Sequence, residues 1–164
     1  MNEEINKRMN EKTVDYSRTE HVQILTQSTL NGYKRLFGGR LMEWIDIVAA
    51  VVARRHSGRN VTTAFIDSLS FEGPAYANET LVLKGHITYT GKTSMEVCVK
   101  TYVESLGSEL SLINTAYVVM VALDENDKPT PVPRLILQTD EEKAEWSRAL
   151  KRKELRTKRR NEEY

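Results

Sequence analysis

The sequence has little cysteine and no visible signal for export or membrane insertion. Cys98 is its single cysteine, so no internal disulfide can form, and this composition favours a reducing compartment. Residues 1–6 lack the apolar core of a secretory signal peptide, and no run combines the length and apolar character of a membrane span. We therefore expect a cytoplasmic protein with no membrane segment and no membrane partner.

The sequence also lacks the short motifs that mark several common catalytic sites. It contains no Gly-x-Ser-x-Gly nucleophile elbow, no P-loop, no His-Glu-x-x-His zinc motif and no cysteine pair for a metal. The three histidines, His21, His56 and His86, lie in different segments and predict no ligand cluster. The net charge of +1 points to no particular partner. We expect neither a metal nor a cofactor.

An almost unbroken apolar run follows Gly38 and Gly39, which we interpret as a turn. The run predicts a helix over residues 40–56, roughly 25 Å long, and a helix that is apolar on all sides is expected to be buried. One acid, Asp46, lies in the middle of the run. A buried carboxylate costs several kcal/mol unless it is paired or has a function. Asp46 is therefore either a structural acid, bonded to an arginine or to backbone amides, or a functional one.

Strand-like segments surround this helix along the chain. The turns between the later segments are short enough for antiparallel hairpins. Such a sheet must cover an apolar face, and the apolar helix is the element available to fill that role. The sequence predicts an α+β fold, a single domain over residues 17–138 in which the sheet wraps around the long central helix. The predicted strands are residues 19–27, 61–71, 81–90, 94–104 and 110–123.

The alternation of side chains predicts which face of a strand meets the helix. In residues 61–71, one face carries Val61, Phe65, Leu69 and Phe71. In residues 94–104, an apolar face is opposed by a polar face that carries Glu96, Cys98, Lys100 and Glu104. We expect the sheet to be buried on its helix side alone. Asp67 is a second acid among apolar neighbours, and we expect it to have a structural role at a subunit contact.

The two ends of the chain are polar. Residues 1–16 predict a leader without fixed structure. At the other end, residues 139–164 form a charged helix or tail, because Thr139 and Glu142 make a capping box that opens a helix. Residues 151–160 are mostly basic, but no aromatic residues alternate with them. A solvated helix is therefore favoured over contact with nucleic acid.

Four segments follow one another along the chain. They are Asn31-Gly32 with Phe37-Gly38-Gly39, Leu-Met-Glu-Trp-Ile-Asp at residues 41–46, Val-Thr-Thr-Ala-Phe-Ile-Asp-Ser-Leu-Ser-Phe at residues 61–71 with Pro74, and Gly-Lys-Thr-Ser-Met-Glu-Val at residues 91–97. No single segment is specific, but their order and spacing are. Together they resemble the hotdog-fold acyl-CoA thioesterases, specifically the cytosolic acyl-CoA hydrolase subfamily. The resemblance extends over residues 18–125, and a fifth segment, residues 116–124, fits it as well.

The resemblance implies a hotdog domain whose subunits pair so that their sheets join. It implies a homodimer, extended to a trimer of dimers, with active sites at the dimer interface. By motif, the family's catalytic acid and asparagine fall on Asp46 and Asn31, often contributed by opposite subunits. The family usually has fewer residues between the asparagine and the glycine pair, so residues 33–36 resemble a two-residue extension.

The chemistry of thioester hydrolysis agrees with these residues. The reaction needs an activated water and a stabilised oxyanion. Asp46 can take a proton from water or attack the carbonyl itself, and the sequence does not separate these routes. The amides of Gly38 and Gly39, at the positive end of the helix, can face the developing oxyanion. Asn31 would orient the water or the carbonyl.

Coenzyme A adds phosphates that cationic side chains can bind. The candidates for substrate binding are Arg55, His56 and Lys92 for the phosphates, with Thr93 and Ser94 beside the pantetheine arm. We therefore expect an acyl-CoA thioesterase that hydrolyses acyl-CoA to a free fatty acid and coenzyme A. The alternative is a hotdog module that binds or senses acyl-CoA without cleaving it. A hydratase on the same fold and a nucleic-acid-binding tail are less favoured alternatives.

Overall fold

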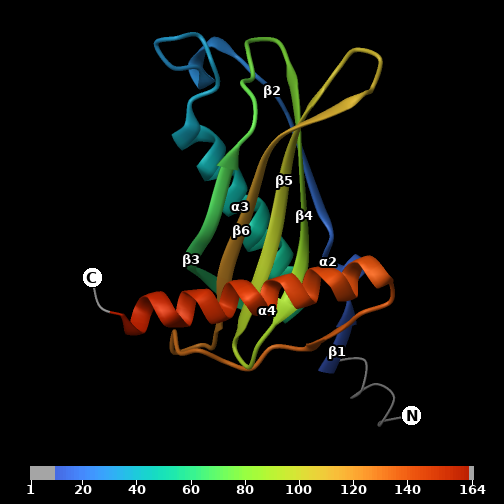
Figure 1. Cartoon of the computed structure of the whole chain (residues 1–164), viewed down its shortest axis with the longest axis vertical. Helices are drawn as coiled ribbons and strands as arrows, with labels where there is room; N and C mark the ends of the chain where they lie inside the picture. Colours follow the sequence, from blue (N-terminus) through green and yellow to red (C-terminus); the bar gives the residue numbers. More distant parts are fainter. Residues whose placement is uncertain (1–9, 163–164) are drawn as a thin grey trace.

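A five-stranded antiparallel sheet wraps around one long helix in the computed structural model, which describes residues 10–162 (Figure 1). In chain order the elements are β1 (Glu11–Thr13), α2 (Val14–Ser17), β2 (Thr19–Ile24), the 3₁₀ turn η1 (Gln27–Thr29), α3 (Gly38–Ser57), β3 (Asn60–Phe71), β4 (Thr80–Thr90), β5 (Ser94–Glu104), β6 (Leu110–Leu123), β7 (Arg134–Ile136) and α4 (Asp140–Asn161).

The sheet has the strand order β2-β4-β5-β6-β3, and every neighbouring pair is antiparallel. The helix α3 lies behind it in Figure 1, and α4 crosses its front. The predicted α+β fold, with a sheet around a long central helix and a charged C-terminal helix, is confirmed. None of the helices within residues 10–162 is long and apolar enough to span a membrane.

The central helix α3 begins at Gly38, so the two glycines form its first turn and the predicted turn at these positions is wrong. Its sheet-facing side fills the core with Leu41, Ile45, Val48, Ala49 and Val52. The helix is capped after Ser57 by Gly58, which has a left-handed conformation with φ of 67°. A side chain at Gly85 of β4 would lie 2.7 Å from Val48, so glycine is needed where helix and strand meet.

The opposite side of α3 is not buried within a single chain. Met42 is 40% exposed and Ile47 is 49% exposed. The prediction that the helix is buried on all sides is therefore wrong for the isolated chain. Exposed apolar side chains on a central helix suit contact with a second chain.

The edge strand β3 departs from its predicted alternation. Two β-bulges, between Thr63 and Phe65 and between Ile66 and Ser68, shift its register against β6. Each bulge adds a residue and moves the following side chains to the other face. As a result Phe65 is 44% exposed, although Leu69 packs against the core as predicted.

The outer face of the sheet is covered as well, by α4. Glu96 on β5 is 1% exposed, and the Arg152 side chain of α4 donates to both of its carboxylate oxygens, at 2.7 Å and 3.2 Å. Thr88 donates to the same carboxylate at 2.7 Å. The polar face predicted for residues 94–104 therefore meets α4 instead of solvent.

Asp67 is the second buried acid beneath α4. Arg156 Nη1 donates to Asp67 Oδ2 at 2.6 Å and to Glu96 Oε2 at 3.2 Å. Asp67 was predicted to have a structural role, and its partner Arg156 lies in the same chain. The basic residues 151–160 are therefore not all solvated. The capping box at Thr139 and Glu142 is confirmed.

Part of the predicted leader has fixed structure. Residues 11–17 form β1 and the short helix α2, where Val14 and Ser17 are buried. β1 pairs in parallel with β7, a strand that the sequence did not predict because three residues after a proline-rich segment show no periodicity. Residues 1–9 of the predicted leader lie outside the described residues.

We predict that Arg152→Met lowers the free energy of unfolding by about 3 kcal/mol, because it leaves Glu96 as a buried charge with fewer partners. Urea denaturation at neutral pH measures the change. Lys151→Met, at an exposed neighbouring position on α4, serves as the control and should have little effect. Adding Glu96→Gln to Arg152→Met should restore part of the stability; no restoration would contradict the ion-pair explanation.

Candidate active site

Asp46 lies on the third turn of α3 and is partly exposed in the single chain. Thr63 Oγ1, on the adjacent edge strand β3, donates a hydrogen bond to Asp46 Oδ1 at 2.5 Å. Within the described residues no hydrogen bond reaches the other oxygen, Oδ2. One oxygen is therefore held by a neutral donor while the other is open. No arginine neutralises the carboxylate within residues 10–162.

Nothing in the sequence marks Thr63 as a functional residue. It lies in the quoted segment of residues 61–71, but a threonine in a strand is ordinary, because β-branched residues favour strands. The contact depends on the packing of α3 against β3, which joins two residues 17 positions apart. No local pattern in the sequence reveals it.

The start of α3 presents free backbone amides. The amides of Arg40 and Leu41 bond to the Phe37 carbonyl, whereas none of the described residues accepts from those of Gly38 and Gly39. Amides in the first turn of a helix have no partner inside the helix and carry a partial positive charge. A side chain at Gly39 would lie 2.6 Å from the exposed Phe37 ring, so glycine leaves the ring in this position close to the start of the helix. The pair can bind a developing negative charge.

Asn31 organises the loop that leads to α3. Its Oδ1 accepts from the amides of Tyr33, at 2.9 Å, and Arg35, at 3.2 Å. The side-chain oxygen is therefore occupied, and the Nδ2 amide group is left as the donor. Asn31 is exposed, and among the described residues it makes no hydrogen bond to Asp46. A single chain does not join these two groups directly.

The end of α3 does not fit one of the predicted substrate contacts. His56 is 0% exposed, and its Nε2 lies 2.9 Å from the carbonyl oxygen of Pro133. Burial is the main cause that lowers the pKa of His56. The hydrogen bond with Pro133 opposes this shift, and the charge of Lys12 adds to it. A buried, neutral imidazole cannot contact a phosphate at the surface, so His56 is a structural residue in this conformation. Its neighbour Arg55 is exposed and bonds to the Arg18 carbonyl at 3.0 Å.

The remaining predicted contacts lie together in the turn between β4 and β5. Lys92 is exposed, and Thr93 and Ser94 are partly exposed. Their backbone carbonyls anchor neighbouring segments: Lys92 accepts from Val132 at 3.0 Å, and Thr93 accepts from Ala122 at the same distance. The turn is therefore fixed by its backbone, which leaves the three side chains available to a ligand.

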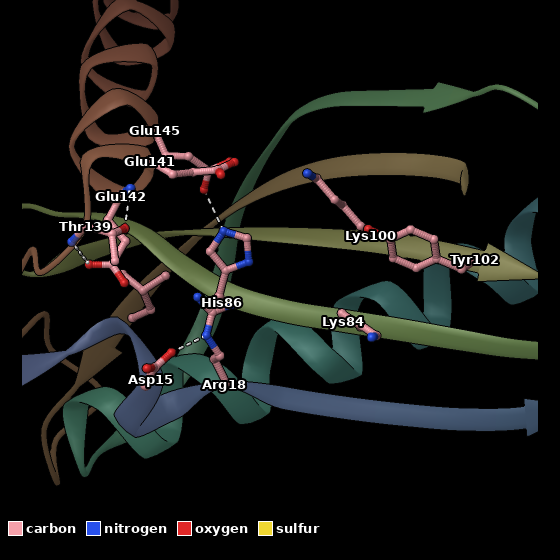
Figure 2. A pocket seen from close by; sticks show the side chains of 11 residues that line it. Asp15, Arg18, Lys84, His86, Lys100, Tyr102, Thr139, Glu141, Glu142 and Glu145 are labelled. Atoms are coloured by element: carbon pink, nitrogen blue, oxygen red, sulfur yellow. Dashed lines mark hydrogen bonds and ion pairs between the residues drawn. The ribbon is translucent and has the colours of Figure 1, made fainter. Parts of the chain in front are cut away.

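A second polar cluster lies under the first turns of α4, in a hollow of about 350 Å³ (Figure 2). His86 of β4 lies opposite Cys98 of β5, and His86 Nε2 is 2.6 Å from Glu145 Oε2 of α4. Burial would raise the pKa of Glu145, but the hydrogen bond and charge of His86, with Lys100 and Arg148, outweigh it and lower that pKa. The sequence predicted no ligand cluster for His86 and did not place it near an acid.

This cluster is the group of described residues that could hold a metal. The ligand atoms of His86, Cys98 and Glu145 lie within 4.8 Å of one another. Burial raises the pKa of Cys98 to about 12, so the thiol is protonated at neutral pH. Lys100 also lines the hollow and would repel a cation. The hydrogen bond between His86 and Glu145 accounts for the cluster, and we assign no metal to it.

We predict that acid destabilises the protein as the pH falls below about 6.5, the ordinary pKa of histidine. The pKa of His56 is lower in the folded chain, so the unfolded chain binds the proton first and is favoured. Above that pH, neutral His56 makes its full contribution to the stability of the folded chain. His56→Gln, which keeps a donor for Pro133, should have a smaller change in stability between pH 7.5 and pH 5.5, measured by urea denaturation. Equal pH dependence in both proteins would contradict the assignment.

The chain resembles known proteins over nearly its whole length. A family model described as Thioesterase superfamily matches residues 33–109. An uncharacterized acyl-CoA thioester hydrolase of Bacillus subtilis is 42% identical over 113 residues, 68% of this chain and 66% of that protein. The cytosolic acyl coenzyme A thioester hydrolase of Rattus norvegicus is 31% identical over 80% of this chain, which spans about a third (35%) of the rat protein.

Two solved structures share the fold and match this chain over nearly their whole length. The crystal structure of an apo-hexameric acyl-CoA thioesterase has a TM-score of 0.88 and 39% identity, over 92% of this chain and 97% of that one. The acyl-CoA hydrolase of Staphylococcus aureus, in complex with butyryl coenzyme A, coenzyme A and coenzyme A disulfide, has a TM-score of 0.88 and 33% identity, over 93% of both chains. Further structures of that hydrolase carry alanine in place of one asparagine, one aspartate or one threonine. By sequence and by fold, this chain belongs to the thioesterase superfamily.

Proposed function

We propose that this chain is an acyl-CoA thioesterase, which hydrolyses acyl-CoA to a free fatty acid and coenzyme A, and that Asp46 is its catalytic carboxylate. The observation that carries the proposal is the geometry of Asp46. It is an acid in an otherwise apolar stretch of α3, fixed through one oxygen by Thr63 and open at the other. Because Asp46 is partly exposed, a water or a thioester can reach the open oxygen.

The variants of the Staphylococcus aureus hydrolase support this choice of residues. The asparagine, aspartate and threonine replaced in those structures follow one another at intervals of 15 and 17 residues. Asn31, Asp46 and Thr63 have the same order and the same two intervals. Relative to that hydrolase, residues 33–36 need no extension, which favours Asn31 as the matching asparagine.

The open oxygen of Asp46 allows two routes for the reaction. In one, Asp46 Oδ2 takes a proton from a water, whose oxygen attacks the thioester carbonyl carbon. In the other, Oδ2 attacks that carbon itself, and water later cleaves the resulting anhydride. In both, the carbonyl oxygen becomes an oxyanion that the amides of Gly38 and Gly39 can bind. The C–S bond then breaks, and the coenzyme A thiolate takes up a proton.

Asn31 supplies a donor from its Nδ2 group, because its oxygen is engaged in the loop. We infer that this group orients the thioester carbonyl or the water from a neighbouring subunit. The β3 edge is open and carries exposed apolar side chains, Phe65, Ile66 and Phe71, which suit pairing with a second copy. A homo-oligomer is therefore proposed, with a trimer of dimers as its full form.

The proposal retains part of the predicted coenzyme A contacts. Lys92, Thr93 and Ser94 stay in the set because their side chains are accessible on a fixed turn. Arg55 also stays in the set, as an exposed cation, whereas the buried His56 is removed from it. The cytoplasmic location, the absence of a cofactor and the absence of a nucleic-acid partner remain predictions.

The alternative, a module that binds acyl-CoA without cleaving it, is less favoured. Such a module has no need for a carboxylate with an open oxygen on a helix whose first amides are free. Release of free thiol from a panel of acyl-CoA thioesters of increasing chain length separates the two. Binding without thiol release over the whole panel would replace the proposed function with the alternative.

We predict that Asp46→Asn lowers kcat by about 100-fold or more, the usual scale for loss of a general base. The amide keeps the shape of the side chain and can still accept from Thr63, so folding and acyl-CoA binding should be preserved. Thiol release, ligand binding and thermal unfolding measure the three properties. Glu43→Gln is the matched control, because Glu43 is an exposed acid on the same helix. Similar kcat values for the two variants would contradict the assignment.

A further inference from the structure

The edge strand β3 joins the candidate catalytic acid on one side of the sheet to α4 on the other. On the inner face, Thr63 Oγ1 donates to Asp46 Oδ1 of α3 at 2.5 Å. On the outer face, where α4 crosses the sheet (Figure 1), Asp67 Oδ2 accepts from Arg156 Nη1 at 2.6 Å. Side chains alternate along a regular strand, so residues 63 and 67 would share one face. The strand must depart from regular geometry to make both contacts.

The first β-bulge of β3 provides that departure. Thr63 pairs with Met120, a buried core residue, whereas Phe65 pairs with Val119, which lies on the outer face with residues of α4. The register shift between Thr63 and Phe65 therefore reverses the alternation. After it, Asp67 points outward to α4 while Thr63 stays on the side of α3.

The second β-bulge lies at Asp67 itself. Ile66 and Ser68 pair with successive residues of β6, so Asp67 has no partner of its own in the ladder. Its side chain is 6% exposed, and that of Arg156 is 16% exposed. A weaker contact comes from Arg159 Nη1, 4.0 Å from the other carboxylate oxygen. A buried ion pair is costly to break, so Arg156 fixes the bulged segment where the ladder does not.

We propose that Arg156 and Asp67 are positioning residues for the reaction, which hold the bulged segment of β3 so that Thr63 reaches Asp46. This inference rests on the proposed function and extends it, because it makes α4 part of the support of the catalytic carboxylate. Neither residue touches the substrate, and both act through Thr63. Their contact is largely buried within one chain, so the role is compatible with a second copy on the β3 edge.

A double-mutant cycle tests whether Arg156 acts through Thr63. We expect Arg156→Met to lower kcat about tenfold with KM for acyl-CoA nearly unchanged, since misplacing a reacting group by about 1 Å can cost about 100-fold. Thr63→Val, which removes the donor to Asp46, should also lower kcat. Adding Arg156→Met to Thr63→Val should lower kcat by less than about twofold more, because both changes remove the same hydrogen bond. Arg156→Lys keeps the charge and should restore most of the activity.

Arg152→Met is the matched control, because it breaks the other buried ion pair of α4, with Glu96 on β5. It should leave kcat nearly unchanged. Asp67→Ala removes the contact from the strand side and should behave as Arg156→Met does, so the test does not depend on one variant. Independent, multiplying losses from Arg156→Met and Thr63→Val, or an equal loss in the control, would overturn the proposal.

Crystal structures of Arg156→Met and Asp67→Ala test the same link without turnover. We expect Thr63 Oγ1 to lie beyond hydrogen-bond distance of Asp46 Oδ1 in both variants. An intact hydrogen bond in both would overturn the proposal whatever the kinetics. If the bond is lost in the variants but the wild-type chain releases no thiol from acyl-CoA, the positioning role is supported and the proposed function alone fails.

Discussion

The packing of α3 against the inner face of the sheet is the contact on which the rest of the structure depends. It buries the largest set of apolar side chains, and Gly85 allows the helix to approach β4 closely. The same contact determines where Asp46 points, because it brings the third turn of the helix beside the edge strand β3 and its Thr63. A core interaction thereby positions a polar pair where α3 lies beside β3, one of the two edge strands of the sheet.

The second helix completes the sheet in a different way. The inner face is covered by apolar packing, whereas the outer face is covered through charged residues, with Glu96 and Asp67 bonded to arginines of α4. Buried ion pairs contribute little net stability compared with apolar packing, but they are costly to break and so define one position for the helix. That fixed position brings the last turns of α4 to the β3 edge, on the opposite side of the sheet from Asp46.

The sequence predicted the features that depend on local pattern. The central helix, the strands of residues 61–123 and the capping box at Thr139 follow from periodicity and composition, and Asp46 was conspicuous because it interrupts an apolar run. What could not be predicted depends on contacts between distant segments. Thr63 beside Asp46, Arg152 beside Glu96 and His56 beneath Pro133 are pairs that only the folded chain brings together. The β3 bulges likewise leave no mark in the alternation of side chains.

We propose that a second copy of the chain completes the active site, because Asn31 and Asp46 make no hydrogen bond to each other within the described residues of one chain. Co-assembly of two variants tests it most directly: Asp46→Asn chains with Asn31→Ala chains, each nearly inactive alone. If each site takes its asparagine and aspartate from different subunits, equal mixing should restore about a quarter of wild-type acyl-CoA hydrolysis, because half of the dimers then hold one intact site. No recovery in verified mixed oligomers would contradict the claim.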